Sequence, residues 1–120
     1  MIDHVDALRR AEDWIASWNA HDIDAILAHY PESFEFVSPV AARQLDRPDG
    51  TIRSKEELRA YFSPHLGPGS PLRFELIDVF AGVSGITIHY RNHRGQRAAE
   101  TMMLDDDGRA ERVVVHYLTD

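Results

Sequence analysis

Apolar positions follow helical spacing in the first part of this chain and alternate in its last third. The apolar positions near the start are three or four residues apart: Val5, Leu8, Ala11, Ile15 and Trp18. This spacing predicts a helix from Asp3 to about Asn19, with Asp3 as its N-cap. A second helix is expected from about Ile23 to Tyr30, because Asp22 can cap it and Pro31 prevents it from continuing.

A strand is expected from about Phe34 to Ser38, followed by an irregular stretch from Pro39 to Arg53. Ser54 and Glu57 have the spacing of a capping box, which predicts a third helix. The apolar residues that this helix would bury are Leu58, Tyr61 and Phe62. The segment 63–71, SPHLGPGSP, is too rich in proline and glycine for a helix or strand, so it is expected to be a connecting loop, part of a mouth or lid.

The rest of the chain alternates between apolar and polar residues and is broken by turns. The expected strands are Leu72 to Phe80, Ile86 to Asn92, Arg97 to Leu104, and Arg109 or Ala110 to Leu118. Three helices followed by a run of antiparallel strands predict an α+β fold.

The turns between these strands set the expected register. A turn at Arg94-Gly95 places His89 opposite Glu100, and the following turn places Glu100 opposite Val115. The turn before the His89 strand places Asp78 opposite His89. Side chains alternate along a strand, so this register puts Asp78, His89 and Glu100 on one face of the sheet.

The other face of the predicted sheet is also apolar. Its most apolar positions are expected to be Ile86, Ile88, Tyr90, Met103 and Val114. A sheet with two apolar faces needs two covers, and the three helices can cover one of them. We therefore expect a homodimer that forms through the outer sheet face.

Composition narrows the class of protein. A length of 120 residues predicts one domain over residues 1–120. The net charge of -7 and the lack of a basic run argue against nucleic acid or a membrane as the partner. The absence of cysteines excludes disulfides, thiolate metal sites and a cysteine nucleophile. The first residues lack an apolar signal core, so a cytoplasmic location is expected. No cofactor is expected.

Three segments resemble the NTF2-like superfamily, particularly its SnoaL-like and ketosteroid-isomerase-like branches. They are WNAHDIDAILAHYPESFEFVSP, GTIRSKEELRAYF and DDDGRAERVVVHY. The resemblance implies a cone in which three N-terminal helices pack on a strongly curved, mostly antiparallel sheet. It also implies a cavity between the helices and the sheet.

The resemblance to ketosteroid isomerases can be followed position by position. Those enzymes use a carboxylate base and an oxyanion hole made of a tyrosine and a protonated aspartate. The matching positions hold Ser38, Trp14 and Glu100 in this chain. The isomerase mechanism is not supported, because the base is replaced by serine. SnoaL-type cyclases also use an acid in the cavity, and this implies an acid/base role for Glu100.

Glu100 and His89 are the candidate catalytic residues. Glu100 stands among small and apolar neighbours in AAETMM, so it is either an inward carboxyl or a solvated one. His89 is either a proton shuttle or a structural histidine bonded to Glu100 or Asp78. His89 and His93 lie too far apart on a strand to chelate a metal readily, so no metal site is expected.

The cavity wall is expected to consist mainly of aromatic residues and to hold a small apolar or aromatic molecule. The candidate substrate-binding residues are Trp14, Trp18, Phe36, Ser38, Tyr61, Phe62, Arg91, Met102 and Tyr117. Three classes of function fit this pattern. The first is an enzyme that performs acid/base chemistry (isomerase, cyclase, dehydratase or hydrolase type) on a small apolar oxygenated compound. The others are a ligand-binding domain without turnover and a dimerisation domain with a filled cavity.

Overall fold

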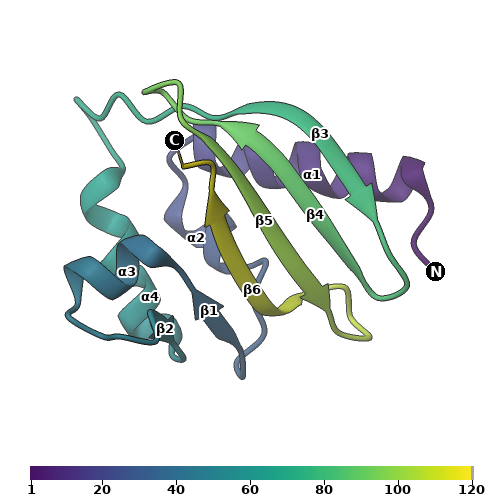
Figure 1. The fold of residues 1–120 in the computed structure, drawn as a ribbon, viewed down its shortest axis with the longest axis horizontal. Coiled ribbons are helices and arrows are strands. Elements are labelled where there is room, and N and C mark those ends of the chain that lie inside the picture. Colours follow the sequence, from purple (N-terminus) through teal and green to yellow (C-terminus); the bar gives the residue numbers. More distant parts are fainter. Residues whose placement is uncertain (120) are drawn as a thin grey trace.

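The computed structural model describes residues 1–119, and these form helices packed on one curved sheet (Figure 1). The helices are α1 (His4–Asn19), α2 (Ile23–Leu27), α3 (Pro39–Gln44) and α4 (Lys55–Phe62), with a 3₁₀ turn at Ser63–His65. The strands are β1 (Glu35–Val37), β2 (Thr51–Ile52), β3 (Glu75–Ala81), β4 (Gly85–Arg91), β5 (Arg97–Leu104) and β6 (Ala110–Tyr117). The predicted α+β class is confirmed, with four α-helices among these residues rather than three.

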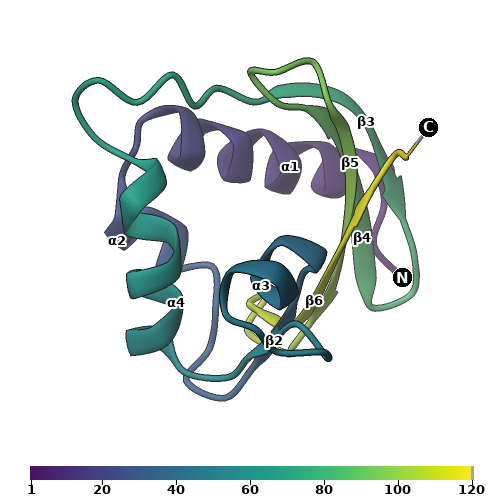
Figure 2. The same cartoon turned by 60° about the vertical axis from the view of Figure 1, so that its left-hand side comes forward.

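The sheet has the order β2-β1-β6-β5-β4-β3. Neighbouring strands are antiparallel except β1 and β6, which are parallel. Figure 2 shows that the sheet curls, with α1 along its concave side and α3 and α4 facing the same side. No helix among residues 1–119 is both long and apolar enough to cross a membrane.

The three predicted helix starts are confirmed by their caps. The Asp3 carboxylate accepts a hydrogen bond from the Asp6 amide at 2.8 Å, and the Asp22 carboxylate accepts one from Ala25 at 3.1 Å. The Ser54 hydroxyl accepts one from the Glu57 amide at 3.2 Å. The second helix ends at Leu27 rather than at Tyr30, and its last residues form a turn.

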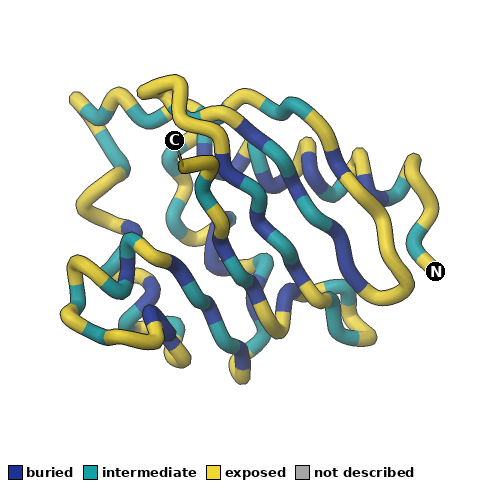
Figure 3. The backbone as a smooth tube through the Cα atoms, in the orientation of Figure 1, coloured by how far each residue is buried: buried dark blue, intermediate teal, exposed yellow. Residues whose placement is uncertain are grey.

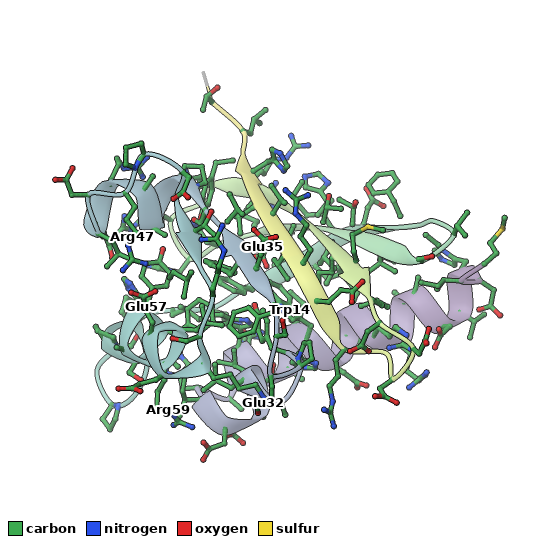
Figure 4. The ribbon with its side chains drawn as sticks, turned by 90° about the horizontal axis from the view of Figure 1, so that it is seen from below. Trp14, Glu32, Glu35, Arg47, Glu57 and Arg59 are labelled. Atoms are coloured by element: carbon green, nitrogen blue, oxygen red, sulfur yellow. The ribbon has the colours of Figure 1, made fainter. Side chains whose placement is uncertain are left out.

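The stretch expected to be irregular, 39–53, contains α3 and β2. Ser38 caps α3, because its hydroxyl accepts a hydrogen bond from the Val40 amide at 3.2 Å. Pro39 occupies the first turn of the helix, where its missing N–H costs nothing. The Arg47 guanidinium donates two hydrogen bonds to the Glu57 carboxylate, joining the loop after α3 to α4 (Figure 4).

The register is confirmed at two positions and wrong at the third. Asp78 lies opposite His89, and Glu100 lies opposite Val115, as expected. However, His89 lies opposite Ala99, and Glu100 lies opposite Ile88.

The reason for this error is the turn between β4 and β5, which spans residues 92–96. Asn92 organises it by accepting hydrogen bonds from the Arg94 and Gln96 amides through its side chain, each at 3.0 Å. Gly95 adopts a φ of 79°, which glycine tolerates without a steric penalty. This odd-length turn shifts the strands by one residue relative to the two-residue or four-residue turn that was expected.

The shift reverses the faces of β4. Ile86, Ile88 and Tyr90 were expected outside but lie on the inner face, each no more than 3% exposed. Thr87, His89 and Arg91 alternate with these residues and occupy the outer face. Figure 3 shows how buried and less buried positions alternate along the strands.

From Asp78 onward β3 is reversed together with β4, because Asp78 still lies opposite His89, and a bulge between Leu76 and Asp78 keeps Leu76 opposite Tyr90. Val79 lies opposite Ile88 and faces inward, whereas the expected register put it, next to Asp78, on the outer face. Phe80 was expected inside, but it is 59% exposed. The outer face is therefore less apolar than the sequence pattern indicated, and three of the five residues expected to form it are core residues.

An aromatic cluster joins α1 to the inner face of the sheet. The ring of Trp14 stacks on Phe74 with 5.7 Å between centroids, and its centroid lies 5.2 Å from that of Tyr90. Trp18 packs edge-on against Phe62 of α4 at 4.8 Å. Aromatic pairs of this kind stabilise a fold by about 1 kcal/mol each beyond the area that they bury.

Candidate functional site

A pocket of about 390 Å³ opens between the inner face of the sheet and helices α1, α3 and α4. Six of the nine expected substrate-binding residues line it: Trp18, Phe36, Ser38, Tyr61, Phe62 and Tyr117. Glu100 lines the same pocket. Aromatic rings form much of the wall, and polar groups reach it from β5, from α3 and from the turn after β4.

Glu100 is held inside the fold. Its residue is 6% exposed, and its carboxylate Oε1 accepts a hydrogen bond of 2.7 Å from the Tyr90 hydroxyl. Burial raises the pKa of Glu100, the Tyr90 hydrogen bond offsets a smaller part of this rise, and the resulting pKa is about 7. At neutral pH both protonation states are therefore populated, which suits a group that gives and takes protons. The predicted inward position of Glu100 is confirmed.

The phenols of Tyr61 and Tyr117 and the hydroxyl of Ser38 line the same pocket as this carboxyl group. Burial and, to a smaller extent, the negative charge of Glu100 raise the pKa of Tyr117 to about 12. Burial also raises the pKa of Tyr61, while the Ser38 hydroxyl lowers it. Both phenols therefore stay protonated at neutral pH and can donate hydrogen bonds to an oxygen atom of a bound molecule.

His89 does not pair with Glu100, because the corrected register places it on the outer face of the sheet. There its Nε2 accepts a hydrogen bond of 3.1 Å from Arg97 Nε. Its Nδ1 lies 3.9 Å from Asp78 Oδ2, which agrees with the structural alternative for this histidine. Arg91 is also on the outer face, where its guanidinium pairs with Glu75 at 3.1 Å. Neither residue lines the pocket.

Trp14 and Met102 line a second, smaller pocket of about 110 Å³ instead. Trp14 is 2% exposed, and its indole N–H has no hydrogen-bond partner among residues 1–119. His29 lies at the same pocket, and its Nε2 is 3.4 Å from the Ser17 hydroxyl. Burial lowers the pKa of His29, while nearby Asp13 raises it. Sequence spacing carries no signal that would single out His29.

The 3₁₀ turn and the loop after it form one side of the larger pocket, through His65, Leu72 and Phe74. Asn19, the last residue of α1, and His21 bind this loop through hydrogen bonds. The Asn19 side chain bonds both backbone groups of Phe74, at 2.7 and 2.9 Å. His21 Nδ1 accepts from the Gly67 amide at 3.1 Å, and its Nε2 lies 2.9 Å from the Leu72 carbonyl oxygen. This fits the expectation that the segment is part of a mouth.

The mouth of the pocket also contains residues that sequence reasoning missed. They are Arg43 of α3, His65, and His93 and Arg94 of the turn after β4. The sequence predicted the turn that contains His93 and Arg94. The position of this turn beside the pocket depends on the curl of the sheet, which the sequence pattern does not report. Among residues 1–119, no three His, Cys, Asp or Glu side chains are grouped to hold a metal ion.

Comparison with known proteins identifies the family. The family model described as a SnoaL-like domain matches residues 11–118. The chain belongs to the SnoaL-like family. No curated protein matches it.

Solved structures agree with this assignment. The SnoaL-like chain is 38% identical to a SnoaL-like protein of unknown function from Burkholderia thailandensis, with a TM-score of 0.93 and 98% of each chain covered. A putative ketosteroid isomerase from Kribbella flavida is 12% identical, with a TM-score of 0.70, 92% of this chain and 76% of that chain covered. AclR, a putative hydroxylase from Streptomyces galilaeus, is 14% identical, with a TM-score of 0.74 and coverage of 97% and 77%. The last two show a shared fold, and the predicted NTF2-like cone is confirmed.

Proposed function

We propose that this SnoaL-like protein is an enzyme that performs acid/base chemistry on a small, largely apolar, oxygenated compound. The observation that carries the proposal is the Glu100 carboxyl group, buried at a pocket and bonded to Tyr90. A buried acid with a pKa of about 7 can remove a proton and return it at neutral pH.

The other groups at the pocket support the same chemistry. Removal of a proton next to a carbonyl group puts negative charge on the carbonyl oxygen. The hydroxyls of Tyr61 and Tyr117 would stabilise that charge, because both stay protonated at neutral pH. The rings of Trp18, Phe36 and Phe62 would hold the apolar part of the compound.

The alternative is a domain that binds such a compound without turnover. This alternative is favoured by Ser38, which occupies the position of the isomerase base but has no carboxylate. Its hydroxyl caps α3. A chain with a single acid can still catalyse proton transfer, because Glu100 can act first as base and then as acid.

Exchange of hydrogen for deuterium next to a carbonyl group tests this proposal without knowledge of the natural substrate. The probes are 2-tetralone and 1-indanone in D₂O, and proton NMR follows the loss of the signals next to the carbonyl. Wild-type protein should accelerate the exchange, and Glu100→Gln should reduce that acceleration by roughly 100-fold or more. Glu111→Gln on exposed β6 is the matched control. Equal exchange by the Glu100→Gln protein would favour the binding alternative.

The homodimer also remains a proposal. Three of the residues that motivated it are in the core, but Phe80 and Met103 still present apolar surface on the outer face, at 59% and 40% exposure. Val83 at the adjacent turn is 70% exposed. Apolar residues gathered on one face of a sheet are a common feature of subunit interfaces.

A further inference from the structure

The titratable side chains at the mouth of the larger pocket are arginines and histidines. Arg43, Arg94, His65 and His93 line it, and Glu100 is its one carboxylate among the described residues. This is unexpected for a protein with 20 acidic residues, 13 Lys and Arg, and a net charge of -7. The local charge at the mouth is therefore opposite to the charge of the whole molecule.

The two arginines are not engaged elsewhere. Within residues 1–119, neither guanidinium forms an ion pair, whereas Arg9, Arg10, Arg47, Arg53, Arg59 and Arg91 each pair with a carboxylate. Arg43 stands at the end of α3, and Arg94 stands in the turn between β4 and β5. They therefore reach one pocket from two separate elements.

The positive charge of Arg43 also affects two phenols of the pocket. Burial raises the pKa of Tyr61 and of Tyr117, and among the smaller influences the Glu100 carboxylate raises both values while Arg43 lowers them. These two phenols, Glu100 and Arg43 all line the same pocket. A single small molecule that contacts the phenols can reach both charged groups.

We propose that the compound bound in this pocket carries an anionic oxygen group, which Arg43 and Arg94 hold at the mouth while its apolar part extends toward Glu100. The inference rests on the proposed function, since it names the substrate class of the same pocket. Guanidinium groups donate paired hydrogen bonds to carboxylate or phosphate oxygens, so the shared chemistry is that of an oxyanion. Such a contact fixes which end of the compound faces the acid, and orientation of this kind speeds a reaction.

Binding of matched probes tests the inference. Isothermal titration calorimetry would compare 2-naphthoate, its neutral methyl ester and 2-naphthyl phosphate, which share one ring system. Wild-type protein should bind an anionic probe at least about 10-fold more tightly than the ester. That preference should weaken when NaCl rises from about 0.05 M to about 0.5 M, because salt screens exposed charges. The stronger of the two anionic probes identifies the carboxylate or the phosphate as the preferred group.

Variants test whether the arginines at the mouth cause the preference for anionic probes. Arg43→Gln and the double variant Arg43→Gln, Arg94→Gln should lose about 10-fold or more in affinity for the anion and keep the affinity for the ester within about twofold. Arg112→Gln is the matched control, because Arg112 is exposed on β6 and does not line the pocket. Equal affinity for ester and anions, unchanged anion affinity in the double variant, or no binding of any probe would each overturn the inference.

The two proposals fail separately. If exchange of 2-tetralone depends on Glu100 but anions have no advantage, the acid/base function stands and the anionic substrate is wrong. If anion affinity depends on Arg43 and Arg94 but exchange does not depend on Glu100, the mouth selects an anionic ligand and the enzymatic proposal is wrong.

Discussion

The Tyr90 hydroxyl donates a hydrogen bond of 2.7 Å to Glu100 Oε1, from one strand of the inner sheet face to the next. The two residues are diagonal neighbours, because Glu100 lies opposite Ile88 and Tyr90 lies opposite Ala98. This contact holds the carboxyl group in one position at the pocket. It also stabilises the charged form of an acid that burial would otherwise keep protonated.

Removal of this hydrogen bond should raise the pKa of Glu100 further. Tyr90→Phe keeps the ring but leaves the carboxylate without its donor, so the protonated form is favoured to higher pH. The cost to the free energy of unfolding should be about 1 kcal/mol. Carbon-13 NMR of the Glu100 carboxyl group measures the pKa directly. Titration at an unchanged or lower pH would contradict the assigned role of Tyr90.

Stability should depend on pH through Glu100. Its pKa is about 7 in the folded protein and 4.5 ordinarily, so the folded state binds the proton more tightly than the unfolded state does. The contribution to the free energy of unfolding is therefore complete below pH 4.5 and is lost as pH rises to about 7, by about 3 kcal/mol. Glu100→Gln should flatten this part of the profile in urea unfolding at a series of pH values.

The control for this profile is built into the comparison. His29, whose pKa is lowered by burial, acts with the opposite sign and is present in both proteins. The difference between wild type and Glu100→Gln therefore isolates Glu100. Parallel profiles for the two proteins would show that the carboxyl group is not held as described.

Asn19 should control the loop at the pocket mouth. Asn19→Ala removes both hydrogen bonds to the Phe74 backbone, and the loss should cost about 1–3 kcal/mol. Asn19→Asp keeps the acceptor for the Phe74 amide and loses the donor, so its loss should be intermediate. Hydrogen exchange should be faster at the Phe74 amide in Asn19→Ala than in wild type. Equal exchange would mean that other contacts hold this segment.

Gly50 should tolerate no side chain. Its φ is 62°, and a Cβ there would stand 2.5 Å from the Ser38 carbonyl oxygen. Gly69 is the control, since its φ is 86° but its surroundings are open. Gly69→Ala should cost about 1 kcal/mol from backbone strain alone, and Gly50→Ala should cost about 1–3 kcal/mol more. Equal losses in urea unfolding would show that the Ser38 carbonyl moves aside freely.

Sedimentation should detect a dimer of the wild-type protein at micromolar concentration. Phe80→Lys combined with Met103→Lys should dissociate it, because both side chains lie exposed on the outer face. Val5→Lys is the control, as Val5 is 77% exposed on α1. A wild-type protein that sediments as a monomer would contradict the dimer.

Local signals in the sequence determined much of this fold. The helix caps at Asp3, Asp22 and Ser54 and the limits of β5 could be read from a few neighbouring residues, because each depends on contacts close in the chain. The helix at Pro39–Gln44 has the same kind of signal, a serine cap followed by proline, although an irregular stretch was expected there. Sequence also indicated Glu100 as a buried acid, since it stands alone among small and apolar residues.

Tertiary structure decided which groups meet at the pocket. One extra residue in the turn at 92–96 moved His89 and Arg91 to the outer face and brought Tyr90 to Glu100. Turn length depends on the hydrogen bonds of Asn92, which the pattern of apolar residues does not report. Arg43 and Arg94 meet at one mouth because the sheet curls around the helices. A strand pattern has a period of two residues, so it predicts that faces exist, whereas the turns and bulges determine which face each side chain occupies.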